Sequence, residues 1–280
     1  MEAEAGGPLR DCFDLIGGTS VGGILAIGVA AGVPAATLRL EIERRGPAIF
    51  RSRLLSVTGL LSARYGAEPL AAAIDAILSP AATAPFASLP ARVPAVAIDQ
   101  RTGQPKIFRS DALAPGAGDR TQMRDAALAT SAAPTFFPAH RADGTTYVDG
   151  GLIANAPDLM LAAEAIRHFS VDLDALKVFA VGTSGSPRAG LAMDAPGKLA
   201  WIARHDLAAL SIDAQARLAT DQFDRLLPAG VMRVDGRPRK PIAMDDASRG
   251  ATRLLVELAE TAFGHLKATR AAELRAMLAR

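Results

Sequence analysis

Short apolar runs alternate along this chain with segments whose apolar residues recur at helical spacing. The runs that predict strands cover residues 93–98, 105–108, 145–148, 176–181 and 231–234. The segments that predict helices cover residues 35–45, 68–78, 122–130, 157–169, most of 198–227 and the stretch from 246 onward. Residues 49–64 lack a clean period and are expected to form a surface connection, with a lid over a site as the alternative. The alternation indicates an α/β protein with a mostly parallel central sheet flanked by helices.

A break in this pattern lies near the N-terminus, where an apolar run at residues 13–16 is followed by glycines around one serine and then by a second apolar run. Gly18-Thr19-Ser20-Val21-Gly22 fits the G-x-S-x-G nucleophile elbow, in which a strand turns sharply into a helix and exposes the serine. The N-terminus of that helix would add partial positive charge where an oxyanion forms. Ser20 is therefore the candidate nucleophile, although an ordinary glycine-rich strand-to-helix turn would have the same residues.

The composition favours one domain. The chain has 280 residues, of which 50% are hydrophobic, so it can bury a sizeable core. We expect a single domain over residues 1–280, with the motifs in a core at about 11–185 and a helical C-terminal part at about 195–280. Lys and Arg total 31 against 29 Asp and Glu, and the formal charge of +2 gives no reason to expect a nucleic-acid polymer as partner.

The cysteine count and the N-terminal residues bear on cofactors and compartment. Cys12 is the single cysteine, which excludes an intrachain disulfide and a cysteine-based metal cluster. No metal and no cofactor are expected. Residues 1–8 are acidic and lack the basic start and apolar core of a signal peptide, and the longest apolar run, about 22–33, is shorter than the roughly 18 residues of a membrane span. These features predict a cytoplasmic protein whose membrane contact is peripheral.

A serine nucleophile needs a base to accept its proton. Four histidines follow Ser20, which makes the Ser-acid-His order of α/β-hydrolases formally available: His140, His168, His205 and His265. None of them lies in a distinctive loop. Asp149 is the better candidate, because it ends a predicted strand and two glycines after it allow close approach of the backbone. An aspartate that opens a turn is the alternative interpretation.

Two further segments have the composition of anion-binding loops. Gly182-Thr183-Ser184-Gly185-Ser186 could hold an anion with backbone amides, but it lacks the ending of a P-loop and is interpreted as a strand-end loop. Four basic residues lie close together further on, at Arg233, Arg237, Arg239 and Lys240. They suit anionic headgroups or nucleotide phosphates, with a solvated loop as the simpler interpretation.

Three motifs, in this order, resemble those of the patatin-like phospholipase family. The segment from Asp14 to Gly23 resembles the family's elbow, and Ala129-Thr130-Ser131-Ala132-Ala133-Pro134-Thr135-Phe136-Phe137-Pro138 resembles its helix-ending segment. Tyr147-Val148-Asp149-Gly150-Gly151 resembles the segment that carries the family's second catalytic residue. The glycines that support these motifs are Gly18, Gly22, Gly23, Gly150 and Gly151.

The resemblance implies a three-layer fold and a catalytic dyad without a histidine. Ser20 would attack a carboxylic ester of a membrane phospholipid, and Asp149 would act first as base and then as acid. The backbone amide of Val21 would help to stabilise the oxyanion. Water would then release the fatty acid from the acyl-enzyme, as in a phospholipase of the A type.

The sequence departs from the family pattern before Ser20. Family members carry a glycine-rich D-G-G-G-x-R-G element on a first strand well before the elbow, and its amides form much of the oxyanion hole. Only residues 1–19 precede Ser20 here, and Gly6-Gly7-Pro8-Leu9-Arg10 has a faint likeness to that element. Two explanations are open. One, which we favour, is a recorded start that is too late; the other is a catalytically impaired relative that binds lipid or nucleotide.

One subgroup of the family is the most similar. Gly23-Ile24-Leu25-Ala26 and the hairpin segments 97–99 and 107–108 most resemble bacterial effectors that degrade membranes when a cyclic nucleotide signals phage infection. This resemblance implies two partners, a phospholipid membrane surface and a cyclic nucleotide activator. It also implies a location at the inner membrane.

Overall fold

The computed structural model describes residues 1–52, 62–184 and 207–279 of the chain. Its strands are β1 (Gly18–Thr19), β2 (Pro94–Asp99), β3 (Pro105–Arg109), β4 (His140–Ala142), β5 (Thr145–Asp149), β6 (Val178–Val181) and β7 (Val231–Val234). Its α-helices are α1 (Glu2–Ala5), α2 (Val21–Ala30), α3 (Ala35–Ile49), α4 (Ala67–Leu78), α5 (Met123–Thr130), α6 (Gly151–Ala154), α7 (Asp158–Phe169), α9 (Leu207–Leu226), α10 (Arg249–Thr269) and α11 (Ala271–Leu278). The α/β class is confirmed.

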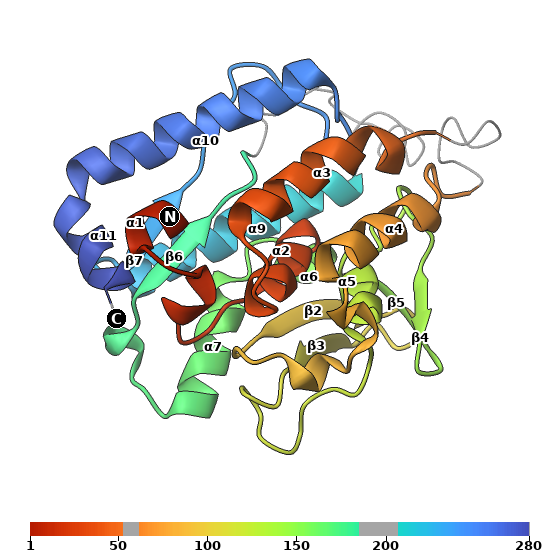
Figure 1. Ribbon diagram of the computed structural model, residues 1–280, viewed down its shortest axis with the longest axis horizontal. Helices are drawn as coiled ribbons and strands as arrows, with labels where there is room; N and C mark the ends of the chain where they lie inside the picture. The colour runs from red at the N-terminus through yellow and green to blue at the C-terminus, as the bar shows by residue number, and fades with distance from the viewer. Residues whose placement is uncertain (53–61, 185–206, 280) are drawn as a thin grey trace, which may run out of the picture.

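A five-stranded sheet is centred on β2 (Figure 1). The antiparallel strand β3 pairs with one edge of β2 from Pro94 to Ile98. A strand has two edges, so β1 and β5 share the other one: β1 lies opposite residues 95–96 and β5 opposite residues 97–99. The short strand β4 extends the sheet beyond β5. Two strands therefore meet end to end along one edge of β2.

The expectation of a mostly parallel sheet is wrong. Within the five-stranded sheet only β1 and β2 are parallel, whereas β2–β3, β2–β5 and β4–β5 are antiparallel. The length of the connections explains two of these antiparallel pairs. β3 follows β2, and β5 follows β4, after a few turn residues, which can join only antiparallel neighbours. The parallel pairs β1–β2 and β6–β7 are each joined by long connections that contain helices.

Helices α2, α3, α4 and α5 pack against one another and over β2 in the view of Figure 1. Their buried faces and the sheet form the largest apolar cluster, which includes Ile27, Ile74, Phe86 and Phe108. The helices follow the predicted periodicity. Along α4, for example, the buried apolar residues recur at helical spacing, at Leu70, Ala73, Ile74, Ile77 and Leu78.

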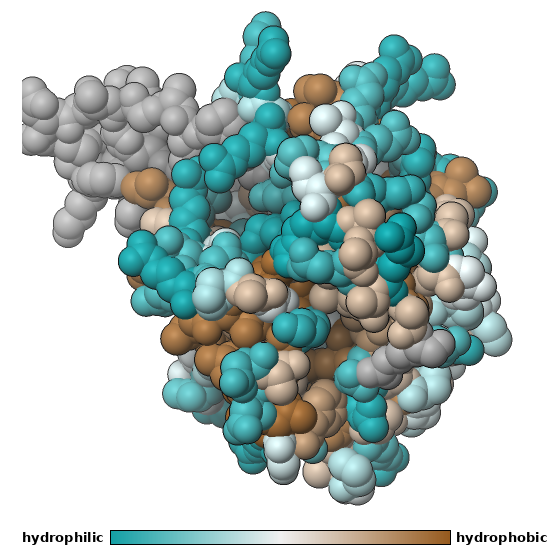
Figure 2. All heavy atoms as spheres, turned by 90° about the vertical axis from the view of Figure 1, so that its left-hand side faces the viewer, coloured by the Kyte–Doolittle hydropathy of each residue, from teal (hydrophilic) through white to brown (hydrophobic). Residues whose placement is uncertain are grey.

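The second sheet, β6–β7, lies beside the terminal helices. Helix α10 packs on β7, and α11 packs on α1, so the two ends of the chain are neighbours (Figure 1). A smaller apolar cluster between them contains Cys12, Met232, Leu266 and Leu274. On the face shown in Figure 2, apolar side chains gather in the lower half, with hydrophilic ones above.

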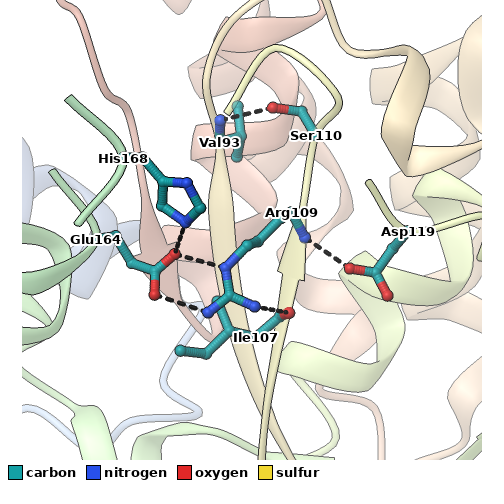
Figure 3. A network of polar contacts seen from close by, with 7 residues as sticks. All are labelled: Val93, Ile107, Arg109, Ser110, Asp119, Glu164 and His168. Carbon is teal, nitrogen blue, oxygen red and sulfur yellow. Dashed lines mark hydrogen bonds and ion pairs between the residues drawn. The ribbon is translucent and has the colours of Figure 1, made fainter. Parts of the chain in front are cut away.

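A buried ion pair fastens α7 to the first sheet (Figure 3). Arg109 of β3 donates from Nε and Nη2 to the two carboxylate oxygens of Glu164 at 2.5 and 2.7 Å. Glu164 is almost completely buried, so this bidentate contact compensates for the loss of its hydration. The ion pair fixes α7 relative to the sheet.

Two local expectations differ from the structure. The strand before the elbow is reduced to Gly18–Thr19, and just before it the Ile16 amide donates to the Arg92 carbonyl in the loop before β2. Strand β4 was not predicted, since its three residues are too few to show a period. Residues 53–61 of the predicted surface connection and 198–206 of the predicted helix lie outside the described residues.

The core described above makes a stability prediction. Ile27 of α2 is completely buried in the main cluster, whereas Leu40 of α3 is 60% exposed. Ile27→Ala is expected to lower the free energy of unfolding by about 2–5 kcal/mol, because it leaves a cavity between helices and sheet. Leu40→Ala is expected to change it by about 0.5 kcal/mol or less. Urea denaturation measures both, and equal losses would contradict this description of the core.

Candidate active site

The register of the first sheet brings the two candidate residues together. The last residue of β1, Thr19, lies opposite Val96 of β2, and the last residue of β5, Asp149, lies opposite Ala97. Because β1 is parallel and β5 antiparallel to β2, the two strands approach the same point from opposite directions. Ser20, the next residue after β1, meets Asp149 there: Ser20 Oγ donates to Asp149 Oδ2 at 2.6 Å.

Ser20 has the backbone of a sharp strand-to-helix turn. Its φ of 57° and ψ of −129° lie in a region that residues with a side chain rarely adopt. Glycines on both sides permit the tight packing, since a Cβ on Gly18 would overlap the Gly22 carbonyl and a Cβ on Gly23 would lie 2.7 Å from a side-chain carbon of Thr130. A Cβ on Gly22 would meet open space, so packing does not require glycine at that position.

Asp149 is buried and hydrogen-bonded through both carboxylate oxygens. Oδ2 accepts from Ser20, and Oδ1 accepts from the Gly151 amide at 2.6 Å. Burial raises the pKa of Asp149 to about 6, although both hydrogen bonds lower it part of the way back. A Cβ on Gly150 would overlap the Val96 carbonyl, so Gly150 permits the expected close approach of the backbone, whereas a Cβ on Gly151 would lie 3.0 Å from the Asp149 carboxylate. A carboxylate with this pKa can take up a proton and release it near neutral pH.

Helix α2 begins directly after Ser20. The amides of Val21 and Gly22 lie in its first turn, where helix geometry leaves amides without a partner inside the helix. Together with the helix dipole they make the space beside Ser20 Oγ favourable for a negative charge. Among the described residues, no strand pairs with the outer edge of β1, and residues 2–5 are helical, so no strand is seen before β1.

The end of α5 contacts both residues of the pair. The Ser20 amide donates to Thr130 Oγ1 at 3.1 Å, and the hydroxyl of Thr130 donates to the Val96 carbonyl at 2.6 Å. The Asp149 amide donates to the Ala132 carbonyl at 3.0 Å. The sequence motif contained these residues, but no spacing rule indicates that a threonine 110 positions away reaches Ser20.

The described histidines have other partners than the serine. His140 Nε2 lies 2.9 Å from Asp125, and His168 Nε2 lies 3.5 Å from Glu164 (Figure 3). His265 is exposed on α10. His205 lies outside the described residues. Among the described residues, Asp149 is thus the titratable side chain that the structure brings to Ser20 Oγ.

In each of the two segments with anion-binding composition, one residue bonds to an acidic side chain, whereas Arg237, Arg239 and Lys240 are exposed. Arg233 lies 3.3 Å from Asp158 and 3.0 Å from Asp224, and the Ser184 amide donates to Asp235 at 2.9 Å. Gly185 and Ser186 lie outside the described residues. In the described ranges, no group of three or more His, Cys, Asp or Glu residues could hold a metal ion.

Ser20 and Asp149 open onto a cleft whose lining is mainly apolar. Side chains of α2, α3 and the segment after α5 contribute to it, including Val21, Leu25, Ile42, Phe50 and Phe136. Residues of β6 and α9 also line it. Such a lining suits an acyl chain more than a charged small molecule.

None of the helices in residues 1–52, 62–184 and 207–279 is long and apolar enough to cross a membrane.

Comparisons with known proteins find one family and several similar proteins. Residues 3–161 match the model of the family described as patatin-like phospholipase. A cGAMP-activated phospholipase of Pseudomonas aeruginosa is 33% identical over 266 residues, which cover 91% of this chain and 79% of that protein. A cGAMP-activated phospholipase of Vibrio cholerae is 36% identical over a region that covers 62% of this chain and 54% of that protein. A cUMP-AMP-activated phospholipase of Escherichia coli is 26% identical over 81% of this chain and 69% of its own.

The family match covers more than half of the chain and includes both Ser20 and Asp149. The similarity to the Pseudomonas aeruginosa protein extends over 91% of this chain. This chain therefore belongs to the patatin-like phospholipase family.

Proposed function

We propose that this protein hydrolyses carboxylic ester bonds of membrane phospholipids with a dyad of Ser20 and Asp149. The hydrogen bond of 2.6 Å from Ser20 Oγ to Asp149 Oδ2 carries the proposal, because it puts a proton acceptor directly on the nucleophile. The strained turn and the first turn of α2 support it, since they expose the hydroxyl and surround it with amide donors.

In the first half of the reaction, Ser20 Oγ attacks the ester carbonyl carbon while its proton passes to Asp149 Oδ2. The carbonyl oxygen becomes an oxyanion, which the Val21 amide and the α2 dipole stabilise. The tetrahedral intermediate then collapses. The bond to the alcohol oxygen breaks, Asp149 returns its proton to that oxygen, and the lysophospholipid leaves the acyl-enzyme.

In the second half, a water molecule takes the place of the alcohol. Asp149 accepts a proton from the water as it attacks the acyl carbon, and the Ser20 ester bond breaks. Asp149 then gives the proton to Ser20 Oγ, and the free fatty acid departs. One carboxylate serves both halves because its pKa lies near the working pH.

The apolar lining of the cleft supports a lipid as substrate, and the proposed place of action is the inner surface of the cytoplasmic membrane. The names of the relatives support regulation by a cyclic nucleotide, since they are called cGAMP-activated or cUMP-AMP-activated phospholipases. We include such an activator in the proposal. Fatty-acid release from vesicles, measured with and without cGAMP, tests this part.

Substitution of either dyad residue tests the catalytic assignment. Ser20→Ala and Asp149→Ala are each expected to lower fatty-acid release from phosphatidylglycerol vesicles on the order of 10³-fold or more, because each removes a group that transfers the proton or the acyl chain. His140→Ala and His168→Ala should retain activity, since both histidines contact other acids. An active Asp149→Ala together with an inactive histidine variant would replace the dyad by a Ser-His mechanism.

The raised pKa of Asp149 predicts the pH profile. The base must be ionised, so kcat/KM is expected to rise with pH up to about 6 and to stay level above it. The measurement uses a water-soluble ester with an uncharged leaving group. A profile that is already level at pH 4.5 would contradict the assignment of Asp149 as a buried base.

The same shift has a consequence for stability. A pKa of about 6 in the folded protein, against an ordinary value of 3.8, means that the folded state holds the proton more tightly than the unfolded chain. The contribution of Asp149 to stability is therefore greatest below pH 3.8 and is lost as the pH rises to about 6. Asp149→Asn, which cannot ionise, is expected to raise Tm at pH 8 and to leave it nearly unchanged at pH 4. A lower Tm of Asp149→Asn at pH 8 would contradict the view that burial of the ionised Asp149 destabilises the folded protein.

A catalytically impaired relative that binds lipid or nucleotide remains the second candidate. The observation that favours it is the outer edge of β1, which no other described strand covers. Binding to phosphatidylglycerol vesicles by both the wild type and Ser20→Ala, without release of fatty acid by either, would support this candidate over the enzyme.

A further inference from the structure

The C-terminal end of α5 holds the backbones of both dyad residues. The Ser20 amide donates to Thr130 Oγ1 at 3.1 Å, and the Asp149 amide donates to the Ala132 carbonyl at 3.0 Å. Ser20 and Asp149 are 129 positions apart in the chain, so the separation of their reacting atoms depends on elements that contact both. The short segment from Thr130 to Ala132 is such an element.

Thr130 is a fixed acceptor. Its hydroxyl proton is committed to the Val96 carbonyl at 2.6 Å, which leaves its lone pairs for the Ser20 amide. The side chain is completely buried, and a Cβ on Gly23 would lie 2.7 Å from its methyl carbon, which shows how closely the methyl group packs on α2. The hydroxyl therefore cannot turn to another partner without losing a hydrogen bond in the interior. Through Thr130, the elbow is bonded to the point of β2 where β1 and β5 meet.

Ser20 needs hydrogen bonds to both of its peptide groups, because its backbone conformation is disfavoured. On the helix side, its carbonyl accepts from the amides of Gly23 and Ile24 at 2.9 and 3.1 Å. On the strand side, its amide donates to Thr130 Oγ1. Without the hydrogen bond to Thr130, the backbone angles of Ser20 can relax toward a less strained region. That change would turn the Cβ–Oγ bond away from Asp149.

We propose that Thr130 is a positioning residue: by accepting the Ser20 amide while it is bonded to β2, it holds Ser20 Oγ against Asp149 Oδ2. The inference rests on the proposed function, since a positioning role requires the reaction. Thr130 acts through the backbone of Ser20. It thereby affects the chemical step more than the binding of substrate.

Thr130→Val tests the inference, because valine keeps the shape of the side chain and removes the hydroxyl. We expect kcat on p-nitrophenyl butyrate, a water-soluble ester, to fall roughly 10–100-fold with KM unchanged within about twofold, since a small displacement of the nucleophile slows the reaction without altering the cleft. Thr130→Ser keeps the hydroxyl, and it is expected to restore kcat to within about threefold of the wild type. Should Thr130→Val not fold, Thr130→Ala replaces it with the same expectation.

Ser110→Ala is the matched control. Ser110 directly follows β3, is completely buried, donates its hydroxyl to the Ala91 carbonyl at 2.9 Å and accepts from the Val93 amide at 3.0 Å, so the control removes an equivalent pair of hydrogen bonds from another part of the sheet. Its hydroxyl bonds to neither dyad residue. Its kcat is expected to equal that of the wild type.

The outcomes separate the two proposals. A wild type that hydrolyses the ester no faster than Ser20→Ala contradicts the proposed function, and the role of Thr130 with it. An active wild type with an equally active Thr130→Val contradicts the role of Thr130 alone. The role is also overturned if Thr130→Ser loses as much kcat as Thr130→Val, or if Ser110→Ala does.

Discussion

The site depends on the way two strands share one edge of β2. β3 occupies the opposite edge, so β1 and β5 are left to pair with successive halves of the same strand. Their opposite directions then bring Thr19 and Asp149 to neighbouring positions on β2. A shift of either strand by one residue would turn its side chains to the other face of the sheet and separate Ser20 from Asp149. The helices packed on the sheet and the bonds from Thr130 and Ala132 to the ends of β1 and β5 act to keep this register.

Function and stability oppose each other at this point. Ser20 is held in a strained conformation, and Asp149 is buried to the extent that its pKa rises to about 6. Both features favour the unfolded state at neutral pH, and both give the site its chemistry: an exposed hydroxyl and a base whose pKa suits proton transfer. The surrounding contacts offset the free-energy cost of the strain at Ser20 and of the buried charge at Asp149. The amides of Gly151 and Ser20 have fixed partners, and the apolar core of α2, α4 and α5 lies directly behind the elbow.

The sequence indicated much of the local structure, because local rules govern it. Glycine spacing around Ser20 predicts a sharp turn, and a short apolar run that ends at Asp149 predicts a strand end. Long-range pairing follows no such rule. The meeting of residues 20 and 149 depends on the register of β1 and β5 along β2, and strand β4, which extends the sheet beyond β5, is too short to show a period. The contact of Thr130 with the Ser20 amide belongs to the same class, since it becomes visible only once the helix is packed on the sheet.

The most direct test of the account is the reaction of Ser20 with a fluorophosphonate probe, followed by mass spectrometry of the labelled peptide. The account predicts a single label on Ser20, with a rate that rises through pH 6 and falls on the order of 10²-fold or more in Asp149→Asn, because the base that activates the hydroxyl is lost. Labelling of Asp149→Asn at the wild-type rate, or at another serine, would contradict the claim that these two residues form the catalytic pair.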